Sequence, residues 1–172
     1  MKPRVVIIGS VVIFVAILAL VFLGRPTIRL TAADIQSHLE RKFPLEKREL
    51  IFTARFTDPS VAIDPKTNEV ILGVSTTVSA LGLRAAKAQA EAKGHVRYEP
   101  SSGEIFLDSP AVTVQGLSIV GLSERDQEKA RKFLQGALKL YLGQTALYRL
   151  KKPGPLKSLR VRDAAIEIEL GY

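Results

Sequence analysis

The sequence predicts an α+β domain of mainly antiparallel β-sheet, covered by one long amphipathic helix and preceded by an N-terminal transmembrane helix and a short helix. Three patterns indicate this fold class: an uncharged apolar run over 5–23, two-residue alternation of apolar and polar side chains over 50–114, and an apolar stripe at helical spacing over 130–142. Because no helix separates the clustered strands, we expect them to pair antiparallel, with the long helix on their apolar face.

Length and composition are those of one globular domain with a local membrane feature. The chain has 172 residues, enough for an anchor at 1–25 and one domain at 26–172. It contains no cysteine, which excludes disulfides, thiolate metal sites and lipid attachment through a cysteine. The formal charge of +8 falls to +5 once Lys2, Arg4 and Arg25 are set aside. Such an excess is compatible with anionic lipid and gives no indication of nucleic acid as a partner.

Residues 5–23 are predicted to cross a membrane. These 19 residues carry no charge, and as a helix they would be about 28 Å long, close to the roughly 30 Å of a bilayer's hydrocarbon core. The alternative is a cleaved secretory signal, which needs a shorter apolar region and small residues before the cut. Gly24 with Phe22 two places earlier matches that site poorly, so we favour a retained anchor. Basic residues on both flanks leave its orientation open.

A short helix is predicted over 32–42, directly after the anchor. Thr31 supplies a capping hydroxyl and Asp34 an acid three places on, the pattern of a capping box. Apolar residues follow at helical spacing, and Pro44 is expected to stop the helix.

Alternating segments predict a series of six strands after this helix. They span residues 50–57, 61–63, 70–78, 84–98, 105–107 and 112–114. Asp58-Pro59, residues 64–68 and residues 100–103 are expected to break or turn the chain between strands. The alanines of 84–98 favour helix, but the polarity of that segment alternates at every residue. We interpret it as one long strand with a solvated face, because periodicity is the stronger signal.

The long helix is predicted to begin at Ser123, whose hydroxyl precedes acids in the first turn. Its apolar stripe advances in steps of three and four, and comprises Ala130, Phe133, Leu134, Ala137, Leu138, Tyr141 and Leu142. Gly143 is expected to end it. A short extended piece at 146–150, a loop at 151–155 and a final strand at 166–170 complete the expected order.

Thr31-Ala-Ala-Asp-Ile-Gln leading to Lys42-Phe43-Pro44, the uninterrupted strands, one capped helix and the Ile166-Glu-Ile-Glu-Leu end together resemble the YceB-like (DUF1439) family of bacterial envelope lipoproteins. The likeness covers about residues 27–172. That family is in turn similar to half of the tubular lipid-binding fold, in which a curved antiparallel sheet wraps around a long helix and leaves an apolar groove.

The resemblance implies a domain that faces the periplasm from the bacterial inner membrane, and it implies a lipid or another hydrophobic ligand. One departure is plain. Family members typically carry a lipidated cysteine after their signal, whereas this chain has no cysteine and offers the apolar run 5–23 instead. Membrane attachment would then be similar in effect and different in chemistry.

No catalytic or metal-binding pattern is found in the sequence, and we expect neither an enzyme nor a cofactor. His38 and His95 lack metal-ligand spacing and are interpreted as surface residues. Residues 116–121 miss the G-x-S-x-G pattern by one position. Glu167 and Glu169 are expected on the solvated face of the last strand, where paired carboxylates have no catalytic role.

Two features remain as candidate binding sites. A hydrophobic groove between the sheet and the long helix is expected to be lined by Phe52, Phe56, Val74, Val78, Leu134, Leu138 and Tyr141. The small residues of 86–94 would face the helix, where they either let it pack closely or leave room for an acyl chain. Anionic headgroups would contact a basic C-terminal set, Arg149, Lys151, Lys152, Lys157, Arg160 and Arg162, whose plainer interpretation is a solvated loop.

The leading hypothesis is therefore a membrane-anchored, non-catalytic module that binds or transfers a lipid. The alternative is an anchored scaffold of the cell envelope that meets a protein partner through a sheet edge or through Lys151 and Lys152.

Overall fold

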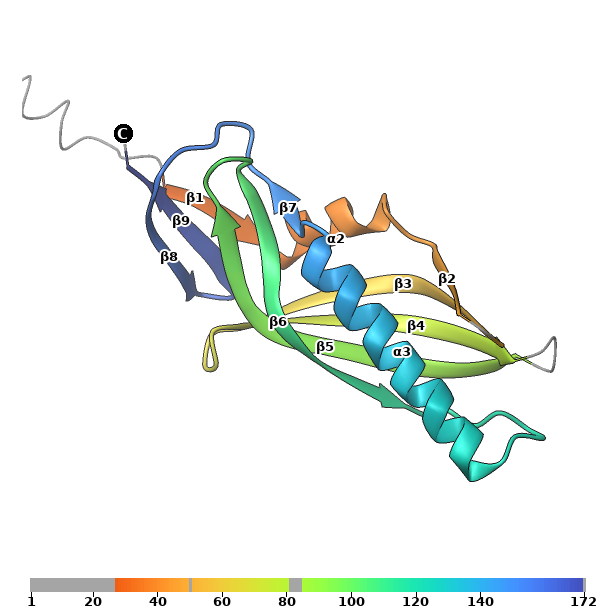
Figure 1. The fold of residues 1–172 in the computed structure, drawn as a ribbon. Coiled ribbons are helices and arrows are strands. Elements are labelled where there is room, and N and C mark those ends of the chain that lie inside the picture. Colours follow the sequence, from red (N-terminus) through yellow and green to blue (C-terminus); the bar gives the residue numbers. More distant parts are fainter. Residues whose placement is uncertain (1–26, 50, 81–84, 172) are drawn as a thin grey trace, which may run out of the picture.

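The computed structural model describes residues 27–49, 51–80 and 85–171 (Figure 1). The predicted anchor at 5–23 lies outside these residues. Within the described residues, no helix combines the length and apolarity that crossing a membrane requires.

A large antiparallel sheet forms most of the molecule. Its six strands lie in the order β2-β3-β4-β5-β6-β7. They are β2 (Leu45–Glu49), β3 (Phe52–Asp64), β4 (Glu69–Ala80), β5 (Ala86–Glu99), β6 (Glu104–Gln115) and β7 (Tyr148–Arg149). Neighbouring strands follow one another in sequence from β2 to β6, so these five strands form a meander. This part of the structure confirms the predicted α+β class and the antiparallel sheet.

A second sheet of three strands closes the end of the molecule at which the described chain begins. Its order is β1-β9-β8, where β1 is Thr27–Thr31, β9 is Ala165–Leu170 and β8 is Leu156–Arg162. Ile166, Ile168 and Leu170 point inward from β9 and join the core that the large sheet and the helices share. The two sheets therefore belong to one hydrophobic core.

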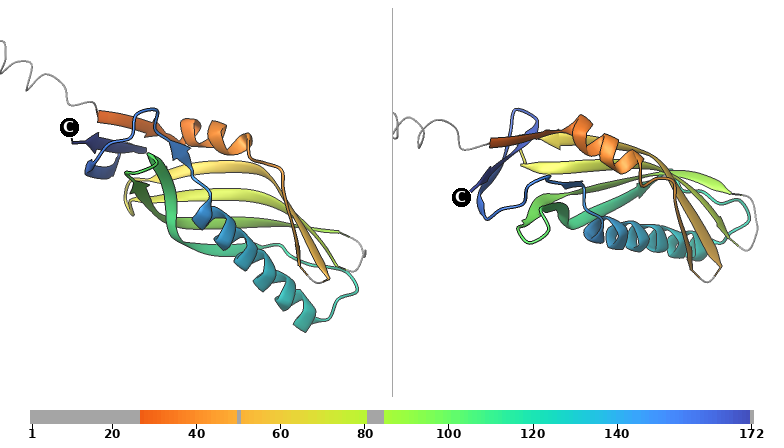
Figure 2. Two further views of the ribbon diagram at one scale, coloured as in Figure 1. Left: turned by 45° about the horizontal axis from the view of Figure 1, so that its top comes forward. Right: turned by 90° about the horizontal axis from the view of Figure 1, so that it is seen from above.

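The long helix α3 (Glu124–Gln144) lies along the concave side of the large sheet (Figure 2). Ala130, Leu134, Leu138 and Leu142 are buried at steps of four, so this stripe is the face that packs against the sheet. The helix contacts β6 most extensively, and β3 and β5 to a smaller extent. The helix passes the expected end at Gly143, because Thr145 forms the C-cap.

The short helix α2 (Ala32–Glu40) begins with the predicted capping box. The Asp34 amide donates to the Thr31 hydroxyl at 3.3 Å, and the Thr31 amide donates to the Asp34 carboxylate at 2.9 Å. The Thr31 hydroxyl also donates to the Asp34 carboxylate at 2.6 Å, and this bond, followed by the bond from the Thr31 amide, lowers the pKa of Asp34. Ile35 and Leu39 are buried, and α2 packs beside the part of β3 that β2 does not pair.

Strand β5 settles the conflict between propensity and periodicity in favour of periodicity. Ala86, Ala88, Ala90 and Ala92 are buried while their neighbours face solvent. The strand pairs with β4 and β6 along most of its length. Packing of the alternate face against the helix thus outweighs the helical preference of the alanines.

Two pairs of predicted strands are single long strands in the structure. Asp58-Pro59 sits in a bulge between Thr57 and Ser60, and β3 continues through it. Ser109-Pro110 likewise lies inside β6. At both places the neighbouring edge strand has already ended, since β2 pairs β3 only as far as Phe56 and β7 pairs β6 only at residues 104 and 105. No described strand on that side therefore needs the backbone N–H that proline lacks.

Strands β1, β2 and β8 were not predicted. β2 and β8 are edge strands with mostly exposed or half-buried residues, so they lack the alternation on which the prediction relied. The expected basic C-terminal loop is therefore partly a strand: Lys157, Arg160 and Arg162 lie on β8, while residues 151–155 form the loop.

Candidate functional site

The candidate site is a hollow between the β2–β3 hairpin and one flank of α3. Its volume is about 480 Å³. Its lining comes from three elements and comprises Lys47 and Glu49 of β2, Phe52 of β3, and Lys129, Lys132, Phe133, Gly136, Ala137 and Leu140 of α3. Carbon atoms form most of the inner surface, while lysines stand at the rim.

The strand register explains which side chains of β2 face the hollow. Lys47 pairs with Ala54 and Glu49 with Phe52, and both β3 partners are buried on the concave side. Because side chains opposite each other share a face of the sheet, Lys47 and Glu49 also point to that side. A short edge strand of mixed character thereby carries polar groups to the border of the core.

Helical spacing explains the opposite wall. Lys129, Phe133 and Ala137 follow at steps of four, next to the fully buried stripe of α3. Gly136 has no side chain, and a Cβ built there meets no heavy atom of the described residues within 4 Å. The hollow stays open because small residues occupy the part of the helix that faces the hairpin.

An aromatic pair forms one wall of the hollow. The rings of Phe52 and Phe133 stack with centroids 5.8 Å apart and planes inclined by 20°. Phe52 is 7% exposed and belongs to the core, whereas Phe133 is half-buried and borders the opening. The stack joins the hairpin to α3 on one side of the hollow and leaves flat apolar surface facing into it.

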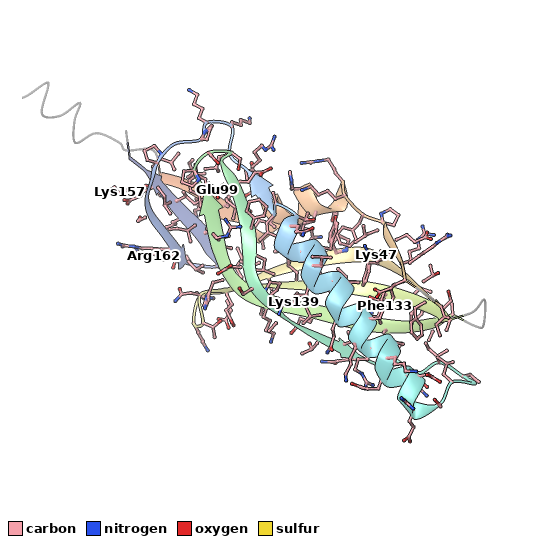
Figure 3. All side chains as sticks on the ribbon, in the orientation of Figure 1. Lys47, Glu99, Phe133, Lys139, Lys157 and Arg162 are labelled. Carbon is pink, nitrogen blue, oxygen red and sulfur yellow. The ribbon has the colours of Figure 1, made fainter. Side chains whose placement is uncertain are left out.

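The charge around the hollow is positive. Three lysines and one glutamate line it. Lys129 forms an ion pair of 2.8 Å with Asp126 on its own helix. Within residues 27–49, 51–80 and 85–171, no ion pair involves Lys47 or Lys132. Figure 3 labels Lys47 and Phe133, from the two walls.

A second hollow of about 430 Å³ lies on the other flank of α3, against β5 and β6. It shares Gly136 and Leu140 with the first, and Leu140 is 53% exposed on the ridge between them. Arg97 borders it and stacks over the Phe106 ring at 5.0 Å. The outer face of α3 thus carries an exposed leucine with an apolar depression on each side.

Comparison with known proteins establishes the family. A family model described as a protein of unknown function, DUF1439, matches residues 30–171. The chain belongs to the DUF1439 family. The match extends from β1 to the end of β9, so it covers the whole described fold apart from its first residues. No curated protein matches the chain.

Most residues predicted to line a groove lie in the packed core of this DUF1439 domain. Phe56, Val74, Val78, Leu134 and Leu138 are each no more than 3% exposed. Phe52 alone of the predicted set lines the hollow, and Tyr141 is half-buried in an edge-to-face contact with Phe43 at 6.0 Å.

The sequence does not show which side of the apolar stripe of α3 borders the hollow. Phe133 and Ala137 were recognised as part of the apolar stripe but not as groove residues, because the stripe alone does not tell which side faces an opening. The lysines were missed because they resemble ordinary solvated residues. The usable signal was Gly136, a helix-weakening residue in the middle of an amphipathic helix.

The predicted basic set does not line the hollow. Its residues lie on β7, on the following loop and on β8, and Figure 3 shows Lys157 and Arg162 at the end where the described chain begins. Several are paired. Arg149 contacts Glu104 at 2.6 Å, Lys157 contacts Glu169 at 3.4 Å, and Arg162 contacts Asp163 at 3.8 Å. Lys151, Lys152 and Arg160 are exposed.

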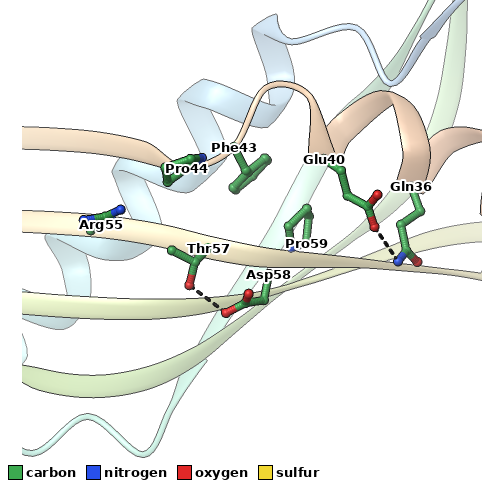
Figure 4. Close-up of a pocket in the computed structure, with 8 residues that line it drawn as sticks. All are labelled: Gln36, Glu40, Phe43, Pro44, Arg55, Thr57, Asp58 and Pro59. Carbon is green, nitrogen blue, oxygen red and sulfur yellow. Dashed lines mark hydrogen bonds between the residues drawn. The ribbon is translucent and has the colours of Figure 1, made fainter.

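A third hollow lies between α2 and the bulge of β3 (Figure 4). Its volume is about 560 Å³, and its lining comprises Gln36, Glu40, Phe43, Pro44, Arg55, Thr57, Asp58 and Pro59. Polar groups bond within it: Gln36 donates to Glu40 at 2.9 Å, and Thr57 donates to Asp58 at 2.8 Å. It lacks the continuous apolar wall of the first hollow.

The two histidines lie apart and have different environments. The His95 ring contacts the Asn68 carbonyl at 3.1 Å on an exposed surface. The pKa of His38 is lowered by burial and by Lys42, Arg41 and Arg149, with Glu104 opposing the shift. In the part of the chain that the structure describes, no three His, Cys, Asp or Glu side chains gather closely enough to hold a metal ion.

Proposed function

We propose that this DUF1439 domain binds or transfers a lipid or another hydrophobic ligand without catalysing a reaction. Residues 5–23 would tether it to the bacterial inner membrane, with the domain facing the periplasm. The observation that supports the proposal most strongly is the apolar hollow between the β2–β3 hairpin and α3. Protein interiors are close-packed, so an open apolar space of this size beside a packed core favours a ligand site.

The size and lining of the hollow suit an aliphatic chain. Ligand sites commonly measure roughly 300–1,000 Å³ and are mostly apolar with a few polar groups. The hollow, at about 480 Å³, has apolar walls from Phe52, Phe133 and Leu140 with lysines at its rim. An acyl chain gains ~0.8 kcal/mol for each methylene that leaves water. In this proposal the acyl chain contacts Phe52, Phe133 and Leu140, and not the core residues behind them.

The architecture also fits the likeness to half of the tubular lipid-binding fold. In that comparison a curved antiparallel sheet partly encloses a long helix, and the ligand occupies apolar space between them. Here α3 lies on the concave side of the large sheet (Figure 2). The hollow is lined by residues of β2, β3 and one flank of the helix. The likeness supports the proposal as an argument from arrangement, and the hollow supports it independently.

Filling the hollow from Gly136 tests the proposal. Gly136→Leu places a side chain in the open space, and its backbone is helical, so the variant is expected to fold. The full chain is purified from membranes, and the lipids extracted with it are identified and quantified by mass spectrometry. The expected result is a stoichiometric lipid in the wild type and a loss of about tenfold or more in Gly136→Leu, because the side chain occupies the site.

Gly143→Leu is the matched control. Gly143 lies on the same helix, a Cβ there also meets no heavy atom of the described residues within 4 Å, and it does not line the hollow. This variant should keep the lipid. Equal lipid content in wild type and Gly136→Leu, or no lipid in either protein, would contradict the proposed site.

A further inference from the structure

We infer that the hollow binds an amphiphile with one acyl chain and an anionic headgroup, which Lys47, Lys129 and Lys132 contact at its rim. This inference rests on the proposed function, and it adds the chemical class of the ligand. The distribution of charge and apolar surface in the hollow between the β2–β3 hairpin and α3 supports it.

The lysines come from both walls of the hollow. Lys47 lies on β2, and Lys129 and Lys132 lie on α3, so lysines from opposite walls border the same hollow. Lysine stems lie along apolar surface while the charged ends stay in water. This arrangement places positive charge where a headgroup would emerge and carbon surface where a chain would lie.

The described residues neutralise only part of this positive charge. Glu49 is the one carboxylate among the lining residues, against three lysines. Asp126 engages Lys129 at 2.8 Å, but none of the ion pairs formed by the described residues includes Lys47 or Lys132. An anionic headgroup completes these contacts, a neutral one gains no charge–charge attraction from them, and a cationic one is repelled.

The dimensions favour a single chain. The hollow, at about 480 Å³, lies in the lower half of the range that ligand sites occupy, and the ridge at Leu140 separates it from the second hollow on the other flank of α3. A headgroup with a carboxylate or with a phosphate monoester satisfies the same lysines. The shared requirement is one aliphatic chain with negative charge at one end.

Photo-crosslinking in membranes tests the inference with defined probes. The full chain in bilayers is exposed to four diazirine-bearing probes with the same hexadecyl chain, ending in carboxylate, phosphate, hydroxyl or trimethylammonium. Labelled residues are mapped by mass spectrometry. Both anionic probes are expected to label residues of the hollow, such as Phe133 and Ala137, about tenfold more than the trimethylammonium probe, because the lysines attract an anionic headgroup and repel a cationic one.

Charge reversal separates the headgroup contact from the chain contact. Lys47→Glu/Lys132→Glu should reduce labelling by both anionic probes about tenfold and leave labelling by the hydroxyl probe unchanged. Lys139→Glu is the matched control, because Lys139 is exposed on the same helix and borders only the second hollow. It should leave all labelling of the first hollow unchanged.

The outcomes distinguish the two claims. Equal labelling of the hollow by anionic, neutral and cationic probes would overturn the inference while the proposed hydrophobic site stands, and so would full anionic labelling in the Lys47→Glu/Lys132→Glu variant. Labelling of the hollow by none of the four probes would overturn the proposed function and the inference together.

Discussion

Among single residues, the buried hydroxyl of Thr76 is the clearest local imperfection in the core. Thr76 is 2% exposed, and its Oγ1 has no hydrogen-bond partner among the described residues. A buried polar group without a partner costs about 1–3 kcal/mol. Thr76→Val removes that group at similar volume and should raise the free energy of unfolding by about 1–2 kcal/mol in urea titrations.

The neighbouring threonine provides the control. Thr77 points to the opposite face of β4 and is half-buried, so Thr77→Val should change the free energy of unfolding by less than about 0.5 kcal/mol. A Thr76→Val protein less stable than the wild type would mean that the hydroxyl has a partner in solution.

His38 makes stability depend on pH. Its ring lies 5.8 Å from the Tyr148 ring, and burial followed by Lys42, Arg41 and Arg149 lowers its pKa below the ordinary 6.5. Below pH 6.5 the unfolded chain binds this proton more readily than the folded chain. The contribution to stability is therefore complete above pH 6.5 and is lost as pH falls toward the lowered pKa.

Comparing unfolding at about pH 7.5 and about pH 5.5 tests this assignment, because the shifted carboxyl groups titrate lower still. Wild type should lose stability over this interval, and His38→Gln should lose measurably less. Identical losses in the two proteins would show that another group controls the dependence. The pKa values of Asp34 and Glu104 are also lowered, and their contributions disappear only in more acidic solution.

At the scale of elements, two glycines predict stability changes of opposite sign. A Cβ at Gly94 in β5 would lie 2.7 Å from the Asp108 carbonyl oxygen, so Gly94→Ala forces the backbone of β6 to move. We expect a loss of about 1–3 kcal/mol. A Cβ at Gly136 in α3 meets open space, so Gly136→Ala should add about 0.5–1 kcal/mol through helix propensity.

Urea unfolding of the two variants checks both signs in one experiment. Destabilisation by Gly136→Ala would mean that the flank of α3 is packed and that the hollow is closed in solution. Stabilisation by Gly94→Ala would contradict the close approach of β5 and β6 at the bulge between Lys93 and His95.

The elements that the sequence predicted well are those with one clearly apolar face. Strand β5 and helix α3 bury alternate residues or a stripe, so periodicity identified both. Strands β2 and β8 lie at sheet edges and bury little, so their pairing depends on the partner strand and not on their own pattern. Bulges at Asp58-Pro59 and Ser109-Pro110 let both prolines lie within strands. Local sequence does not reveal where the neighbouring edge strand stops.

The candidate site was predictable only in outline. The sequence indicated that a sheet and the stripe of α3 would face each other, and this is confirmed. The residues chosen from the centre of that stripe, such as Leu134 and Leu138, became core because the sheet packs directly on them. The hollow depends on how the β2–β3 hairpin and α3 are placed relative to each other, which is a property of the assembled fold.

On the scale of the whole molecule, the hollow and the basic C-terminal set occupy different regions. The small sheet carries Lys157, Arg160 and Arg162 at the end where the described chain begins (Figure 1). In the proposed arrangement this end would face the bilayer, where each basic residue can add ~1 kcal/mol of attraction to anionic headgroups. The hollow then lies along the flank of α3, away from that contact.

The central claim is that the space between the β2–β3 hairpin and α3 is a ligand site. The most direct measurement is a crystal structure of the full chain with a brominated hexadecanoate, in which the anomalous signal locates the bromine. The account predicts a bromine position between β2 and α3, beside Phe133 and Gly136. A hairpin closed onto α3, with the bromine elsewhere or absent, would contradict it.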